Sequence, residues 1–235
     1  DANAPALEHG SINAKIVDGP GCPDAKTTGL TVTPLLNGDD VDDGLKNDSV
    51  EGSKTAWTTA GDFSDLIWTI VQGDDGNHIW NGVDADGGPT DTALVSPALT
   101  VSATDHFTIA WKQRHVFEAD DQSSFDGSVV EFSSDGGATW TDVATIADPG
   151  YEGTIGDTSQ QAHNQLAGRA GFVGQNASYP NFDDVSIDLG TALAGQTVQV
   201  RFRLDTDEAG GADGWDLDDI AFTGIDNAPF SGLVE

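Results

Sequence analysis

The chain has 235 residues, and its 40 Asp and Glu against 9 Lys and Arg give a formal net charge of −31. A surface with this excess of negative charge repels polyanions, which excludes nucleic acid and anionic lipid headgroups as partners bound through a basic face. Hydrophobic residues make up 37% of the chain, with 6 Trp and 10 Phe, so a packed core is expected rather than a disordered chain.

Covalent crosslinks and membrane spans are not expected. The single cysteine, Cys22, cannot form an intrachain disulfide or a cysteine-based zinc site, and the sequence gives it no role. No stretch approaches 18 consecutive apolar residues, and the given sequence begins at Asp1 without Met or a basic region followed by an apolar stretch. The sequence therefore predicts a soluble protein without membrane insertion, either a processed mature chain or an excised fragment.

The predicted elements divide the chain near residue 46. Residues 1–46 are poor in aromatics and contain strong turn signals at 19–23 and 37–40, so they are interpreted as an N-terminal arm or linker with at most one strand, at 30–33. From residue 47 to 235, short runs rich in Val, Ile, Thr, Phe and Trp alternate with Gly, Asp and Asn clusters, which is typical of an all-β sandwich. The predicted strands cover 66–71, 93–101, 107–117, 127–133, 140–146, 185–189, 197–205 and 215–223.

Local patterns support this assignment. In residues 198–204, apolar and polar side chains alternate, which predicts a strand with one buried and one solvated face. Gly136 and Gly137 supply the positive φ that a hairpin after residue 133 requires. The only helix-permissive stretch is 162–170, and Gly168 limits it.

Several blocks in the second half resemble a known family. They read DTALVSP (91–97), VVEFSSDGGATW (129–140), LAGRAGFVG (166–174), DLG (188–190), GWDLDDI (214–220) and IDNAPF (225–230). In order and spacing they are similar to MAM-like jelly-roll domains of secreted bacterial proteins. With the blocks at 166–174, 188–190 and 225–230, the similarity is closer still to the C-terminal accessory domain of myxobacterial-type, fungalysin-family metallopeptidases. This resemblance covers about residues 47–234 and implies a jelly-roll β-sandwich, location outside the cell or on its surface, and a peptidase catalytic domain as partner.

Catalytic motifs are absent from the chain itself. A zinc peptidase of this kind needs His-Glu-x-x-His, and the five histidines are scattered without it. A Gly-x-Ser-x-Gly elbow is also missing. A pair of carboxyls could serve a glycosidase, but the sequence indicates no cleft between them. The chain is therefore expected to be non-catalytic, with a hydrolase as the least favoured alternative.

Paired acids suggest bound Ca²⁺, which prefers carboxylate and carbonyl oxygens supplied by loops. Asp218 and Asp219 lie among apolar residues of one strand, so at least one carboxylate is expected to turn inward and to require a cation or hydrogen bonds. The family resemblance implies that calcium joins an acid near the first strand to one on the last, here Glu51 and Asp219. An adjacent-acid pair in so acidic a chain is, alternatively, solvated surface.

A second candidate calcium loop follows residue 83. It offers Asp84, Asp86 and Asp91 around a pair of glycines, but it departs from the EF-hand pattern. Glu118 is a further candidate ligand, and an ion pair with Arg114 explains that residue equally well.

Aromatic residues near loops suggest a sugar-binding platform, because a flat ring stacks on a pyranose face. The candidates are Trp57, Trp80, Tyr151 and Tyr179. The favoured alternative assigns these residues to closing the ends of the sandwich and assigns the strand tryptophans to the core. Those strand tryptophans are Trp68, Trp111, Trp140 and Trp215.

The sequence as a whole predicts a jelly-roll, MAM-like antiparallel β-sandwich with an irregular N-terminal arm. Its expected function is that of a calcium-stabilised, secreted accessory or binding module. Two alternatives stay open: a surface structural or adhesive protein that assembles copies of itself through residues 1–46, and a carbohydrate-binding module that takes an extracellular glycan.

Overall fold

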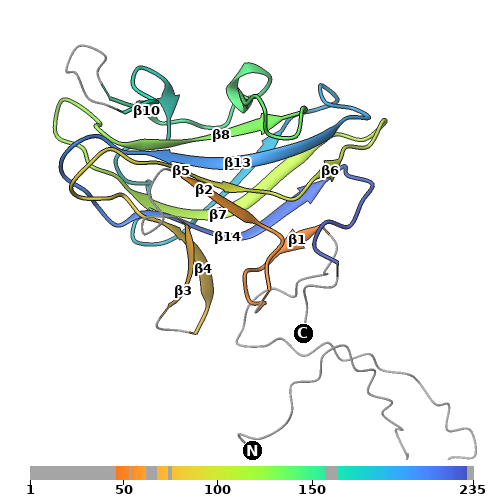
Figure 1. Ribbon diagram of the computed structural model, residues 1–235, viewed down its shortest axis with the longest axis horizontal. Helices are drawn as coiled ribbons and strands as arrows, with labels where there is room; N and C mark the ends of the chain where they lie inside the picture. Colours follow the sequence, from red (N-terminus) through yellow and green to blue (C-terminus); the bar gives the residue numbers. More distant parts are fainter. Residues whose placement is uncertain (1–45, 53, 62–67, 74–75, 157–163, 232–235) are drawn as a thin grey trace, which may run out of the picture.

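The computed structural model describes residues 46–52, 54–61, 68–73, 76–156 and 164–231, and these form a β-sandwich of two antiparallel sheets (Figure 1). The predicted all-β, jelly-roll-like fold is confirmed. The predicted N-terminal arm and its strand at 30–33 lie outside the described residues. Among the residues that the structure describes, no helical segment has the length and hydrophobicity that a membrane span requires.

The first sheet has the order β12-β7-β14-β4-β3, and β1 pairs with β14. Its strands are β1 (Asn47–Asp48), β3 (Thr69–Gln72), β4 (His78–Gly82), β7 (Thr108–Val116), β12 (Asp183–Asp188) and β14 (Gly214–Thr223).

The second sheet has the order β2-β5-β13-β8-β9, and β6 pairs with β13. Its strands are β2 (Thr58–Gly61), β5 (Asp91–Val95), β6 (Leu99–Thr100), β8 (Gly127–Ser133), β9 (Thr141–Asp142) and β13 (Thr197–Asp205). A separate two-stranded ribbon consists of β10 (Gly153–Thr154) and β11 (Ala170–Gly171).

Apolar side chains of both sheets meet in one core, as the alternation along β13 predicts. Its residues 198, 200, 202 and 204 are buried, whereas those between them are partly exposed. Trp111 and Trp215 contact Phe202 with ring centroids 5.2 and 5.6 Å apart, so aromatic rings join the two layers. Trp68 also lies in this core, 2% exposed.

Some local predictions were wrong. Trp140 is not in the core: it lies at the surface of the second sheet, where the Arg201 guanidinium covers its ring at 4.4 Å. The predicted strand at 140–146 shortens to β9, because residues Val143–Thr145 form a 3₁₀ turn capped by Asp142. Within 164–170 the chain makes turns and no helix, and residues 162–163 of that predicted stretch are not described. The predictions also missed β2, an edge strand with little burial, and β4.

Candidate functional site

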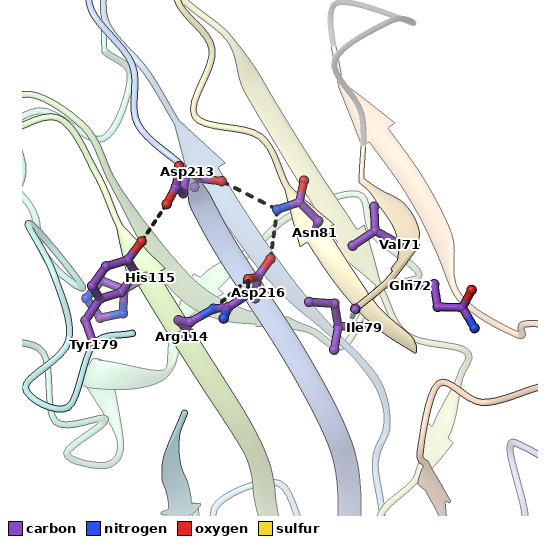
Figure 2. Close-up of a pocket in the computed structure, with 11 residues that line it drawn as sticks. Val71, Gln72, Ile79, Asn81, Arg114, His115, Tyr179, Asp213 and Asp216 are labelled. Atoms are coloured by element: carbon purple, nitrogen blue, oxygen red, sulfur yellow. Dashed lines mark hydrogen bonds and ion pairs between the residues drawn. The ribbon is translucent and has the colours of Figure 1, made fainter. Parts of the chain in front are cut away.

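An open pocket of about 350 Å³ lies on the first sheet, and Figure 2 shows the side chains around it. Its walls come from β3, β4, β7 and β14 and from the segments that precede β12 and β14. The lining residues are Val71, Gln72, Gly73, Ile79, Asn81, Arg114, His115, Tyr179, Asp213, Gly214 and Asp216. We call it the sheet pocket.

The sheet register aligns the polar residues of this pocket in one row. Asp216 of β14 is directly opposite Arg114 of β7 and Asn81 of β4. Oδ2 of Asp216 accepts hydrogen bonds from Nε and Nη2 of Arg114 at 2.9 and 2.6 Å. Its Oδ1 accepts one from Nδ2 of Asn81 at 2.8 Å. Because three hydrogen-bonded strands carry the row, its donors and acceptors are held in fixed positions.

Aromatic side chains lie beside the row. The Arg114 guanidinium lies 5.0 Å from the ring centre of Phe182, and its Nη1 donates to the Pro180 carbonyl at 3.3 Å. The Tyr179 hydroxyl donates to Asp213, and this hydrogen bond is the main reason why the pKa of Tyr179 is raised. Figure 2 shows Tyr179 and Asp213 on one side of Asp216, and Val71 and Gln72 on the other. The pocket therefore combines an aromatic ring, aliphatic side chains and a fixed polar row.

Of the four aromatic residues predicted as a sugar platform, the structure places Tyr179 in this pocket. Trp57 and Trp80 are 5% and 4% exposed, so neither offers a ring face to a ligand, and that prediction was wrong for both. The Trp57 indole N–H donates to Asp48 at 2.7 Å within the core. Tyr151 is half-buried, with its ring edge-on to Phe172 and its hydroxyl bonded to Asp142 at 3.0 Å. Burial of these residues supports the alternative that most loop aromatics close the sandwich.

A cluster of acids lies at one end of the sandwich, and it includes two of the predicted calcium ligands. Carboxylate oxygens of Glu118, Asp126 and Asp207 lie within 4.8 Å of one another. Asp84 joins them: its Oδ2 accepts a hydrogen bond from the Glu118 amide at 2.9 Å, and its carboxyl contacts that of Asp126. We call these four residues the acidic cluster. Sequence reasoning missed Asp126, which has no acidic neighbour and precedes β8, and Asp207, which is followed by Glu208 and lies just after β13.

Burial shapes the protonation of the acidic cluster. Desolvation is the largest cause that raises the pKa of Asp84 and of Asp126, and the contact between the two carboxyls raises the pKa of Asp126 further. The pKa of Glu118 is also raised, first by desolvation and then by the charge of Asp207. The alternative that Glu118 pairs with Arg114 was wrong, because Arg114 binds Asp216.

The other predicted ligands have protein partners. Glu51 accepts hydrogen bonds from the amide and Nδ1 of His78, at 2.6 and 3.1 Å. Asp219 lies 2.5 Å from Nζ of Lys112, and the Asp218 side chain accepts from Asn77 Nδ2 at 3.0 Å. Calcium between Glu51 and Asp219 stays a prediction.

In the 84–91 loop, the three predicted ligands do not share one site. Asp84 belongs to the acidic cluster, Asp86 is exposed, and Asp91 binds Arg203 with Nε–Oδ1 at 2.7 Å. A single calcium loop formed by these three residues is therefore not what the structure shows. Their separation follows from Asp91 being the first residue of β5, where it faces the arginine of the neighbouring strand β13.

No protein-family model matches this chain, and no curated protein matches it in sequence. Among solved structures, it is similar to TmCBM61 in complex with β-1,4-galactotriose, with a TM-score of 0.42 and 10% identity over 74% of this chain and 91% of that one. It is also similar to the glycoside hydrolase domain of Endo-D from Streptococcus pneumoniae R6, with a TM-score of 0.41 and 12% identity over 72% of this chain and 22% of that one.

A third similar structure is described as one of the carbohydrate-binding modules of the β-sandwich superfamily with promiscuous specificity. Its TM-score is 0.39, with 11% identity over 77% of this chain and 62% of that one. With such identities and TM-scores, these likenesses leave the function to be argued from the chain's own residues. The resemblance to MAM-like accessory domains stays a prediction.

Proposed function

We propose that this protein is a non-catalytic carbohydrate-binding module that takes a neutral glycan in the sheet pocket. The observation that carries the proposal is the row Arg114–Asp216–Asn81, fixed across three adjacent strands between the Tyr179 ring and the aliphatic side chains of Val71 and Ile79. Sugars present hydroxyl groups at their edges and C–H groups on their faces. A pocket with fixed donors and acceptors beside an aromatic ring complements both.

Charge favours a neutral ligand. The chain carries a net charge of −31, and two of the pocket residues, Asp213 and Asp216, are acids. An anionic polysaccharide would be repelled by this surface, whereas the hydroxyls of a neutral sugar can bond to amide, guanidinium and carboxylate groups alike.

The same contacts argue against hydrolysis. Both oxygens of Asp216 accept hydrogen bonds from Arg114 and Asn81, so this carboxylate is held as a fixed acceptor of the row. Asp213, the other carboxylate of the pocket, accepts from the Tyr179 hydroxyl. A hydrolytic pair requires one carboxyl that gives a proton to the leaving group and one that activates water or attacks. The pocket is therefore built to hold a ligand rather than to cleave it.

The test is calorimetric titration with soluble neutral oligosaccharides of gluco, galacto, manno and xylo types. At least one series is expected to bind the wild type, and Tyr179→Ala and Asn81→Ala are each expected to weaken that binding about tenfold, equivalent to about 1.4 kcal/mol. Tyr179→Phe, which keeps the ring, separates stacking from the loss of the hydroxyl.

Trp140→Ala is the matched control, because this aromatic lies on the second sheet, away from the pocket. It is expected to leave glycan affinity unchanged. Lack of binding to every neutral series would refute the proposal, and so would a loss of binding in Trp140→Ala while Tyr179→Ala binds normally.

A further inference from the structure

The acidic cluster is formed by four chain segments from both sheets. Asp84 follows β4 and Glu118 follows β7, both in the first sheet, while Asp126 precedes β8 and Asp207 follows β13 in the second sheet. These connections gather at one end of the sandwich, on the left in Figure 1. Any ligand held by all four carboxylates would therefore link the two sheets.

Two carboxylate oxygens of the cluster are buried without a hydrogen-bond partner: Oδ1 of Asp84 and Oε2 of Glu118. Asp84 as a whole is only 3% exposed, and Asp126 beside it is 1% exposed. The other oxygen of Asp84 is occupied by the Glu118 amide, and Oδ1 of Asp126 accepts from the Asp207 amide at 2.6 Å. A buried carboxylate oxygen without a donor or cation is costly, so this arrangement points to a positively charged ligand.

Among the described residues, no Lys, Arg or His side chain forms an ion pair with these carboxylates. The charges acting on Asp84, Asp126 and Glu118 are those of other aspartates. The remaining way to lower the repulsion is to protonate the buried pair. Each added proton provides a hydrogen bond for at most one of the carboxylate oxygens. Protonation of this pair also leaves the negative charges of Glu118 and Asp207 close to each other.

We propose that Asp84, Glu118, Asp126 and Asp207 form a Ca²⁺ site that joins the two sheets at this end of the sandwich. Four carboxylates supply up to eight oxygens and no nitrogen or sulfur, which suits a hard cation with a coordination number of about 6–8. Mg²⁺ demands a stricter octahedron and keeps more of its water, so it fits a dense carboxylate set less well. This site is distinct from the Glu51–Asp219 site that the sequence suggests.

The same cation would order one wall of the sheet pocket. Residues 207–214 lead from the acidic cluster to Asp213 and Gly214 of the pocket. Gly210 packs so closely on Glu118 that a Cβ there would lie 2.1 Å from the carboxylate. Calcium is thus expected to act through the conformation of this segment and not through the glycan itself.

The experiment measures calcium alone, on the full chain freed of metal with a chelator. Calorimetry is expected to show a calcium-binding site that is lost in Asp207→Asn. At a hundredfold excess over its Kd, calcium is expected to raise the melting temperature of the wild type by about 5–10 °C. Mg²⁺ at the same concentration is expected to give a smaller shift.

The variants carry a signature that a purely structural role would not produce. Asp207 is half-buried, and the Asp207→Asn substitution removes one of four like charges. In the presence of a chelator, this variant is therefore expected to melt at or above the wild-type temperature. Added calcium is expected to stabilise the wild type and to leave this variant nearly unshifted. Asp126→Asn should behave alike, and Asp207→Asn keeps the test decisive if the fully buried position fails to fold.

Glu51→Gln and Asp219→Asn are the controls, because both acids lie outside the cluster. They are expected to keep the calcium shift. The proposal is overturned if calcium leaves the wild type unshifted, which would mean that Asp84 and Asp126 only share a proton. It is also overturned if these controls abolish the shift while Asp207→Asn keeps it. Either result leaves the glycan titration, and hence the proposed function, separately testable.

Discussion

Arg203 and Asp91 form a two-point ion pair between neighbouring strands, with Nε–Oδ1 at 2.7 Å and Nη2–Oδ2 at 2.8 Å. Asp91 is one of the acids for which the sequence suggests calcium, yet an arginine of β13 takes that place. Arginine also binds Glu131, which is buried and contacts Arg169 and Arg201 at 2.8 and 2.5 Å. Arginine therefore neutralises Asp91 and Glu131 on the strands, whereas none of the ion pairs among the described residues includes an acid of the acidic cluster.

Replacing Arg203 by Met tests how much this ion pair contributes to the free energy of unfolding. The side chain is 12% exposed and faces Asp91, with Glu131 and Asp205 within 4 Å. Its loss removes the cation that Asp91 binds at two points and that lies near the buried Glu131 and Asp205, so the free energy of unfolding is expected to fall by about 3 kcal/mol in urea titrations. Arg114→Met is the comparison, because its side chain is 34% exposed, and about 1 kcal/mol is expected there. Equal losses in the two variants would contradict this account.

Gln113 holds two tryptophans of the core. Its Oε1 accepts the indole N–H of Trp111 and that of Trp215, each at 3.0 Å. Gln113→Leu removes the acceptor and leaves two buried donors unpaired, so a loss of about 2–4 kcal/mol in the free energy of unfolding is expected. Gln72→Leu, at an exposed position, is expected to change it by less than about 0.5 kcal/mol. A Gln113→Leu protein as stable as the wild type would show that the indole groups find other acceptors.

A comparison of alanine substitutions at Gly214 and Gly136 distinguishes the effect of backbone strain from that of steric conflict. Gly214 and Gly136 both have positive φ, +92° and +73°, so alanine is strained at either position. At Gly214 the new Cβ would also lie 2.1 Å from the Gly82 carbonyl oxygen, whereas at Gly136 it meets open space. Thermal unfolding should therefore show a larger destabilisation for Gly214→Ala, by about 1–3 kcal/mol beyond the Gly136→Ala value. Similar melting temperatures for both variants would argue against tight packing between β14 and β4.

The loop between β8 and β9 gives a pH-dependent prediction. Hydrogen bonds from the Thr139 hydroxyl, the Thr139 amide and the Ser133 hydroxyl lower the pKa of Asp135 from 3.8 to about 2. Because the pKa is lower in the folded state, the ionised carboxylate stabilises the fold above about pH 4, and this contribution is lost as the pH falls towards 2.

Melting curves of the wild type and Asp135→Asn across this pH range provide the measurement. The wild type is expected to be more stable at pH 7, and the difference is expected to shrink between about pH 4 and pH 2. A difference that stays constant with pH would mean that the carboxylate charge does not contribute. Ser133→Ala removes one of the donors that lower the folded-state pKa, so it is expected to narrow this window by raising its lower limit.

The sequence predicts the strands whose side chains alternate most clearly. Strand β13 runs over the residues that its pattern indicates, because a two-residue period is a local property that burial on one face enforces. Strand β8 also has its predicted bounds, although it is buried along its whole length, because a short run with Val and Phe next to a Gly-rich turn favours a strand without alternation. The prediction fails where burial is weak: β2 is an edge strand with little alternation, and Trp140 rests under an arginine on the surface. Such positions depend on neighbouring strands, which local pattern does not reveal.

Charge, core composition and the inward-facing side of the long strands follow from the sequence alone, since each depends on residue type and on a period of two. Which acids meet depends on the order of strands in the two sheets. That order places Asp84 and Glu118 next to Asp126 and Asp207, which lie up to 123 positions away along the chain. It also places Asp91 next to Arg203, with which Asp91 forms an ion pair. Tertiary structure decides these contacts because hydrogen-bonded pairing between distant strands, and not local spacing, fixes which loops share one end of the sandwich.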